Sequence, residues 1–150
     1  MSAYKIREFL PDDLPLLSEL GHQFASEAKI VKFNPDVFAK SWEAFIQSGV
    51  GVIYAAENDF GEVCGAIGAL QFNDPNSGDL MANEMFWIVM PDHRGGCGMM
   101  LLNRLEQWAR GIGCKYLWMN YLMDSMPEKV KSIYERKGFT LAETHWVKEM

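Results

Sequence analysis

The stretch Met90–Leu102, MPDHRGGCGMMLL, joins an apolar run typical of a strand to an apolar run typical of a helix. Three glycines and an arginine lie between the two runs, and we call residues 91–98 the glycine loop. The N-terminus of a helix carries N–H groups without intrahelical partners and the positive end of the helix dipole, which together favour an anion. Glycine also lets a ligand approach the backbone closely. The loop therefore fits a phosphate site, but it equally fits a structural turn.

The composition predicts one folded domain over residues 1–150, because single cores are typically about 100–150 residues long. Hydrophobic residues make up 49% of the chain and charged residues 23%, which favours a packed core over disorder. No apolar run reaches the about 18 residues that a membrane span needs, and the first residues lack the apolar segment of a secretion signal. We therefore expect a cytoplasmic protein without a membrane partner.

Charge and cysteine content narrow the partners further. The net charge of −6 disfavours nucleic acid as a partner, because phosphate must be neutralised by Lys and Arg. The same charge is compatible with a cationic substrate. The cysteines are odd in number and widely spaced, which disfavours a disulfide framework and favours a reducing compartment. Neither the cysteines nor the histidines have the spacing of a metal site, so no metal is predicted.

The hydrophobic pattern predicts an alternation of strands and helices. Strands are expected over residues 4–9, 51–57, 62–72, 83–90, 115–122 and 139–149. Helices are expected over residues 11–28, 35–48, 98–112 and 127–137. The turn at 58–61 predicts an antiparallel hairpin, whereas the strand–loop–helix–strand unit at 84–120 predicts a parallel pair. We therefore predict an α/β (α+β) fold, with a mixed central sheet of six to seven strands flanked by about four helices on both faces.

Two well-known phosphate loops are excluded. The pattern GxxxxGK[ST] is absent, because no Lys-Ser or Lys-Thr follows the glycines. The pattern GxGxxG fails because leucine stands at its last position in GCGMML.

Two segments in order resemble hallmarks of the GCN5-related N-acetyltransferase (GNAT) superfamily. Residues 88–120, IVMPDHRGGCGMMLLNRLEQWARGIGCKYLWMN, are similar to its acetyl-CoA-binding core, and residues 132–139, SIYERKGF, are similar to its LYEKxGF segment. The resemblance covers nearly the whole chain and is strongest from Glu84 to Phe139. Three positions depart from the family pattern: His93 replaces Gln or Arg, Arg94 comes one place late, and Pro127 replaces an Asn.

The resemblance implies an N-acetyltransferase with acetyl-CoA as co-substrate and no metal. In this family a deprotonated primary amine attacks the thioester directly in a ternary complex. The pantetheine arm would pair with backbone groups of Ile88, Val89 and Met90, and an N–H near Val89 would stabilise the oxyanion. The pyrophosphate would be bound by Arg94, Gly95, Gly96, Cys97, Gly98 and Met99.

The resemblance also implies two catalytic residues, each with an alternative. Glu84 is the candidate general base, because the family often places its base on this strand and an apolar setting raises a carboxyl pKa. The alternative is a solvated glutamate at the start of a strand. Tyr134 is the candidate general acid for the leaving thiolate, and the alternative is a half-buried helix tyrosine. A nucleophilic Cys97 is disfavoured, because no histidine with an orienting acid or amide stands beside it.

Other functions remain open at this point. A GNAT-like module that binds acyl-CoA without catalysis, as a sensor or an interaction partner, would share the same motifs. An unrelated α/β protein with a structural glycine turn would need two motif coincidences. The expected acceptor is a small-molecule amine or a protein amine. Homodimers are common in the family, so a homodimer is also expected, although no pattern in this sequence points to one.

Overall fold

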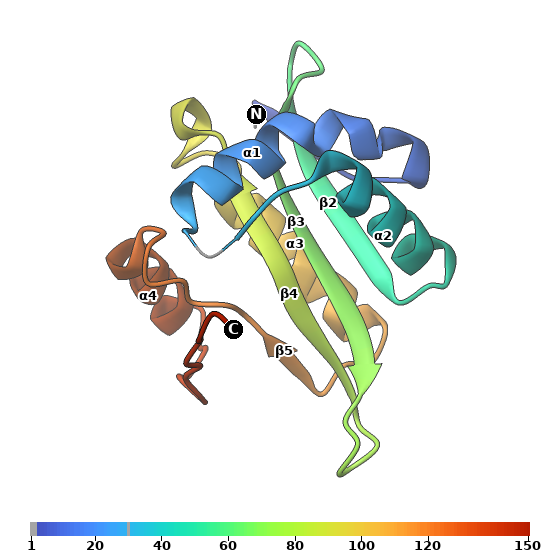
Figure 1. The fold of residues 1–150 in the computed structure, drawn as a ribbon, viewed down its shortest axis with the longest axis vertical. Helices are drawn as coiled ribbons and strands as arrows, with labels where there is room; N and C mark the ends of the chain where they lie inside the picture. Colours follow the sequence, from blue (N-terminus) through green and yellow to red (C-terminus); the bar gives the residue numbers. More distant parts are fainter. Residues whose placement is uncertain (1–2, 30) are drawn as a thin grey trace. The chain divides into compact units, whose positions relative to one another are not determined.

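The computed structural model describes residues 3–29 and 31–150 (Figure 1). Its strands are β1 Tyr4–Glu8, β2 Gly51–Asn58, β3 Val63–Asn73, β4 Leu80–Val89 and β5 Tyr116–Trp118. Its helices are α1 Ser18–Glu27, α2 Pro35–Gln47, α3 Gly98–Gly111 and α4 Pro127–Arg136, with 3-10 turns η1 Pro11–Leu17 and η2 Pro91–His93. The chain divides into a first unit that ends at Asn120 and a second unit over residues 121–150.

The sheet has the order β1-β2-β3-β4-β5. Strands β1 to β4 pair antiparallel, and β5 pairs parallel to β4. The predicted hairpin and the predicted parallel pair are both confirmed. The predicted four helices are confirmed as well.

The number of strands was predicted wrongly, because the sheet has five strands rather than six to seven. The predicted strand over residues 139–149 does not form among the described residues, although its sequence alternates. A strand requires a backbone ladder to a neighbour, and this segment has none in the described chain. Its large apolar side chains lie in solvent, with Leu141 80% and Trp146 97% exposed. The strand predicted over 115–122 is also shorter than expected.

Apolar side chains form a separate core on each face of the sheet. Helices α1 and α2 cover one face and α3 covers the other, as Figure 1 shows with α3 behind the strands. The first core contains Phe9, Leu14, Leu17, Leu20, Trp42, Ile53, Phe86 and Ile88, among others. The second contains Val52, Tyr54, Ile67, Cys97, Leu101 and Leu105, among others. The prediction of helices on both faces is therefore confirmed.

Helix α2 begins where the sequence predicts a start. The Asn34 side chain accepts hydrogen bonds from the N–H groups of Asp36 (3.1 Å) and Val37 (3.2 Å), and Pro35 occupies the first helical position. The Trp42 ring of this helix meets Phe86 of β4 edge-to-face, with the ring centroids 5.3 Å apart. The cap thus places an aromatic cluster on the strand that carries the candidate site.

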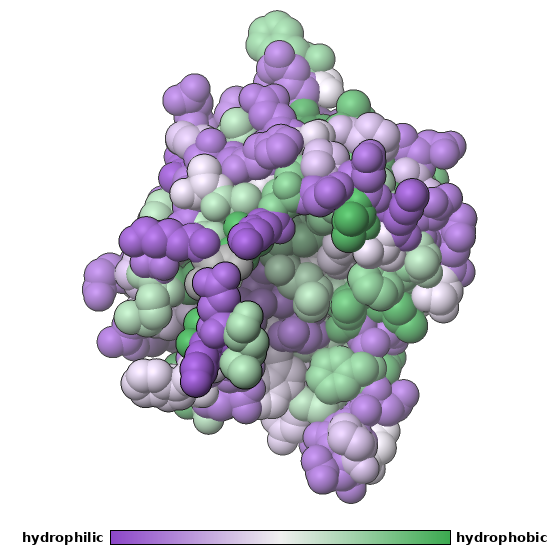
Figure 2. Space-filling view, viewed as in Figure 1, coloured by the Kyte–Doolittle hydropathy of each residue, from purple (hydrophilic) through white to green (hydrophobic). Residues whose placement is uncertain are grey.

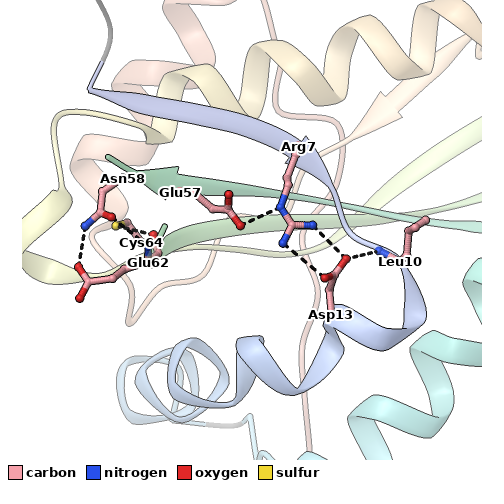
Figure 3. Close-up of polar contacts among 7 residues, drawn as sticks. All are labelled: Arg7, Leu10, Asp13, Glu57, Asn58, Glu62 and Cys64. Atoms are coloured by element: carbon pink, nitrogen blue, oxygen red, sulfur yellow. Dashed lines mark hydrogen bonds and ion pairs between the residues drawn. The ribbon is translucent and has the colours of Figure 1, made fainter. Parts of the chain in front are cut away.

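Arg7 of β1 bonds to residues of β2 and η1 at the edge of the sheet that β1 forms (Figure 3). Its Nε donates to Glu57 of β2 at 2.7 Å, and its Nη1 donates to Asp13 of η1 at 3.0 Å. Asp13 also accepts from the Leu10 N–H at 3.0 Å, and these bonds hold the pKa of Asp13 below its ordinary value. Pro15 lies inside η1, so the helix predicted over 11–28 begins as a 3-10 turn and becomes α-helical only at Ser18.

The β2–β3 hairpin closes through the Asn58 side chain, whose oxygen accepts from the N–H groups of Phe60 and Glu62 at 2.9 Å each. Gly61 follows with a φ of +77°, which favours glycine. Phe60 at this turn is 88% exposed. Figure 2 shows apolar atoms standing at the top of the view, where Figure 1 places this turn, above a surface that is mainly polar.

Candidate active site

Strand β4 carries most of the candidate site, and its pairing is irregular at Glu84. On the β3 side, Gly68 pairs with Phe86 and Ala69 pairs with Glu84, so Met85 is an extra residue in the ladder. Such a β-bulge bends the strand locally. On the other side, pairing with β5 runs only from Met81 to Asn83. Glu84 therefore follows directly after the end of the β4–β5 ladder.

Glu84 is buried, with 4% of its surface exposed. Its Oε2 accepts a hydrogen bond from the Asn120 main-chain N–H at 3.0 Å, and its carbonyl oxygen accepts one from the Asn120 side-chain amide at 2.6 Å. Burial raises the pKa of Glu84 to about 7, while the bonds from Asn120 act in the opposite direction. The alternative of a solvated glutamate is thus excluded, and the carboxyl is able to exchange a proton near neutral pH.

The backbone hydrogen bonds of β4 beyond the bulge reduce the number of residues that could pair with the pantetheine arm. The Met90 N–H donates to the Cys64 carbonyl at 2.9 Å, and the Met90 carbonyl accepts from the His93 N–H at 2.9 Å. Because backbone groups alternate along a strand, those of Ile88 also point toward β3, and those of Val89 point to the opposite edge. Of the three predicted residues, only Val89 directs its N–H toward the edge that β3 leaves open.

The three glycines of the glycine loop have different reasons to be glycine. Gly95 has a φ of +90°, a conformation that other residues rarely adopt. A Cβ on Gly96 would lie 2.7 Å from Cε2 of Tyr4, so a side chain there would force the Tyr4 ring to move. A Cβ on Gly98 would meet only Val89 at 3.5 Å and Trp87 at 3.7 Å, which are ordinary contacts. The chain's own packing therefore does not require glycine at position 98.

The side chains of the glycine loop are engaged within the chain. Arg94 donates through Nη2 to Glu27 of α1 and through Nε to the Val89 carbonyl at 3.1 Å. The Tyr4 hydroxyl and the His93 Nδ1 are 3.0 Å apart. The Cys97 thiol is fully buried, and burial raises its pKa to about 11, which disfavours the thiolate that a nucleophile needs. The predicted contact of Arg94 with phosphate stays a prediction.

The predicted backbone donors of the loop differ in availability. The Gly96 N–H donates to the His93 carbonyl at 3.3 Å. Helix α3 begins at Gly98, so Gly98 and Met99 contribute the first N–H groups of the helix, which have no intrahelical acceptor. These two residues are the strongest candidates for the pyrophosphate among those predicted.

Tyr134 belongs to the second unit, within α4. Its side chain is half-buried, and its ring lies 5.4 Å from that of Phe139. Pro127, which replaces the family's Asn, is the first residue of α4, where its fixed φ suits a helix start. The proposed role of Tyr134 as an acid stays a prediction.

Two residues that bond to predicted site residues were missed from the sequence: Asn120, which bonds to Glu84, and Glu27, which pairs with Arg94. Asn120 lies inside the segment predicted as a strand, and an Asn in a strand does not by itself indicate a functional site. Glu27 lies 67 residues before its partner Arg94, and no local pattern links the two.

Among the described residues, no group of three or more His, Cys, Asp or Glu side chains is placed to hold a metal ion. In the same part of the chain, no helix has both the length and the apolar character to cross a membrane.

Comparison with solved structures shows the same fold in proteins of similar length. Ribosomal-protein-alanine N-acetyltransferase from Brucella melitensis biovar Abortus 2308 is 21% identical, with a TM-score of 0.77 and 99% of each chain covered. Glucosamine-6-phosphate N-acetyltransferase from Arabidopsis thaliana is 18% identical, with a TM-score of 0.77 and 97% of each chain covered. An aminoglycoside acetyltransferase from an uncultured soil metagenomic sample is 15% identical, with a TM-score of 0.78. The alignment with this acetyltransferase covers 100% of the present chain and 99% of the acetyltransferase.

No curated protein sequence matches the chain. A family model does match it: the acetyltransferase (GNAT) domain aligns with residues 49–141, from the start of β2 to beyond α4. The matched region includes the bulged β4, the glycine loop and α3, and it makes up more than half of the chain. The chain therefore belongs to the GNAT acetyltransferase family.

Proposed function

We propose that this protein transfers an acetyl group from acetyl-CoA to a primary amine by direct attack in a ternary complex. The observation that carries the proposal is the buried Glu84 carboxyl with a pKa raised to about 7. A general base works best when its pKa is close to the working pH, because it is then both partly ionised and basic enough to accept a proton. Membership of the GNAT family supports acetyl transfer as the reaction.

The residues of β4 and α4 have separate roles in the proposed reaction. Glu84 takes a proton from the substrate ammonium, which frees the nitrogen lone pair to attack the thioester carbonyl. The Val89 N–H donates to the oxygen that becomes negative as the tetrahedral intermediate forms. When the carbon–sulfur bond breaks, Tyr134 donates its hydroxyl proton to the leaving thiolate. The attacking nitrogen loses its second proton as the amide forms, and that proton restores the Tyr134 hydroxyl by way of solvent. The products are the amide and CoA, and the proton held by Glu84 then passes to solvent.

The glycine loop is proposed to bind the pyrophosphate of acetyl-CoA. The N–H groups of Gly98 and Met99 open α3, where the helix dipole favours an anion. The space at Gly98 supports this role. The packing of the protein would tolerate a side chain at this position, so a bound ligand is a reason for glycine there. Since Arg94 is bonded to Glu27, the proposed site relies on backbone donors more than on the arginine.

The acceptor is proposed to be a small-molecule amine or a protein amine. The net charge of −6 favours a cationic acceptor. The similar structures are named for a protein alanine, a sugar phosphate and an aminoglycoside, so the shared fold does not select among acceptors.

The test is release of CoA, detected with a thiol reagent, across a panel that contains a polyamine, a lysine peptide, an aminoglycoside and glucosamine-6-phosphate. A reaction without amine serves as the blank, because Cys114 is a free, half-buried thiol of the protein itself. Turnover with at least one amine is expected. Binding of acetyl-CoA in parallel is measured by melting temperature, which a specific ligand raises; about 100 Kd of ligand adds about 2.7 kcal/mol of stability.

Two outcomes would contradict the proposal. A raised melting temperature without turnover on any amine would favour a non-catalytic acyl-CoA sensor. An unchanged melting temperature at saturating acetyl-CoA would remove both the transferase and the sensor.

A further inference from the structure

The end of the β4–β5 ladder is closed by one residue that makes two hydrogen bonds to Glu84. Main-chain pairing between the strands stops at Asn83 and Trp118. Two residues further along, the Asn120 side chain donates to the Glu84 carbonyl at 2.6 Å, while its own N–H donates to the Glu84 carboxylate at 3.0 Å. The side-chain amide thus bonds to the last carbonyl, and the main-chain N–H is turned to the carboxylate.

The two bonds restrain both ends of the Glu84 residue. The bond to the carbonyl fixes the backbone next to the bulge at Met85, and the bond to Oε2 fixes the orientation of the carboxylate. The other carboxylate oxygen, Oε1, makes no hydrogen bond to a described residue. Proton exchange with a substrate would therefore take place at Oε1.

The elements packed against β4 bring no cation to this carboxylate. These elements are α1, α3, β3 and β5, together with α2, whose Phe38 and Trp42 rings meet Phe86. Their titratable side chains are Glu19, His22 and Glu27 on α1, Asp36, Lys40 and Glu43 on α2, Arg104, Glu106 and Arg110 on α3, Cys64 on β3 and Tyr116 on β5. The pKa of the Glu84 carboxyl is raised by burial and lowered by the hydrogen bonds from Asn120, and none of these groups shifts it. Asn120 therefore stabilises the ionised form of Glu84 against the effect of burial.

We infer that Asn120 is the positioning residue of the proposed reaction: it holds the Glu84 carboxylate at the end of the β4–β5 ladder with Oε1 left for the substrate proton. This inference rests on the proposed function for the identity of the proton donor. The placement of the carboxylate itself is independent of that function. Asn120 acts through Glu84 and does not touch the reacting atoms.

The test compares Asn120→Asp and Asn120→Ala with the wild type. Aspartate places a negative charge beside the Glu84 carbonyl and carboxylate, which disfavours ionisation of Glu84. Alanine removes the side-chain bond but keeps the main-chain N–H. As a control, Gln107→Glu makes the same exchange of amide for carboxylate on the exposed face of α3.

The primary readout is the carbon-13 NMR titration of the Glu84 carboxyl, assigned with Glu84→Gln, because this readout does not depend on turnover. We expect Asn120→Asp to raise the midpoint by about one pH unit, Asn120→Ala to raise it less, and Gln107→Glu to leave it unchanged. A one-unit rise lowers kcat/KM about tenfold below pH 6 and leaves it within about threefold at pH 9.

An unchanged midpoint in both Asn120 variants would overturn the inference, whatever happens to stability. If Asn120→Asp fails to fold, the Asn120→Ala midpoint decides alone. Shifted midpoints in a protein that acetylates no amine would support the placement of Glu84 by Asn120 and refute the proposed function.

Discussion

The region around Glu84 on β4 and the region around Arg94, in the glycine loop that follows β4, place a carboxylate in opposite surroundings. After the β4–β5 ladder, Glu84 is buried, and within residues 3–29 and 31–150 its carboxylate and carbonyl accept hydrogen bonds from the neutral donors of Asn120. Beyond the last residue of β4, the guanidinium of Arg94 in the glycine loop pairs with Glu27 of α1 and also donates to the Val89 carbonyl. The first arrangement favours proton exchange, because nothing cationic compensates for lost hydration. The second favours a fixed ion pair that joins α1 to the glycine loop.

The largest contrast is expected from neutralising the two carboxylates, beginning with Glu84→Gln. Because the pKa of Glu84 is raised to about 7 in the fold, the folded state holds a proton that the unfolded state releases near pH 4.5. Folding stability therefore falls as the pH rises from about 4.5 to 7, by about 3 kcal/mol in total. Glutamine lacks this loss, so the variant should gain stability over the wild type between pH 5 and pH 8, measured by denaturant unfolding. If the difference in unfolding free energy between Glu84→Gln and the wild type stayed constant from pH 5 to pH 8, this would contradict the description of Glu84 as buried without a cation beside it.

Glu27→Gln should change stability in the opposite direction. The substitution removes the charge that faces Arg94 and weakens a bond between partners about one-fifth exposed. We expect a loss of about 1 kcal/mol at pH 8, with the value reduced by solvent screening. Urea unfolding at pH 8 of both glutamine variants gives the comparison directly. If Glu84→Gln and Glu27→Gln changed the free energy of unfolding in the same direction, the two regions would not differ as described.

Substitution of the glycines should separate ligand binding from folding within the glycine loop. Gly98→Ala is expected to raise KM for acetyl-CoA by about 3–10-fold, on the order of 1 kcal/mol, with little change in melting temperature, because its Cβ has room in the fold. Gly96→Ala is expected to lower the melting temperature, since its Cβ would clash with the Tyr4 ring. The reverse pattern would refute the assignment of Gly98 to the cofactor.

The smallest effect on turnover is expected from Cys97→Ala. The thiol is fully buried and its pKa is raised to about 11, so the substitution removes packing rather than chemistry. Turnover at 25 °C should stay within about twofold, with a stability loss of about 1 kcal/mol. Iodoacetamide should modify Cys114 before Cys97 in the native protein, as peptide mapping by mass spectrometry will show. Loss of turnover without loss of stability would instead assign a catalytic role to Cys97.

Local patterns predicted much of the fold. The Asn34–Pro35 start of α2, the hairpin turn at Asn58 and the strand–loop–helix unit around the glycine loop all depend on residues close in sequence, and all formed as expected. Residues 139–149 alternate as a strand does, but strand formation depends on a backbone partner, which the alternation of one segment does not reveal.

The candidate site was predictable only in part. Glu84 and the glycines stand out by position, whereas the bond of Asn120 to Glu84 and the bond of Arg94 to Glu27 join residues that are 36 and 67 positions apart. The sequence also did not separate the backbone of Val89 from that of Ile88 and Met90. That distinction depends on which edge of β4 pairs with β3.

The most direct test of the proposed mechanism is the pH dependence of kcat/KM for an accepted amine, at saturating acetyl-CoA, in the wild type and in Glu84→Gln. The amine is chosen with its own pKa above 9, so that its ionisation is separated from that of Glu84. The wild type should show a limb with a midpoint near 7, in accord with the raised pKa of Glu84. Glu84→Gln should lack that limb and be slower by about 10²–10⁴-fold. The same limb in Glu84→Gln, at a comparable rate, would contradict the assignment of Glu84 as the general base.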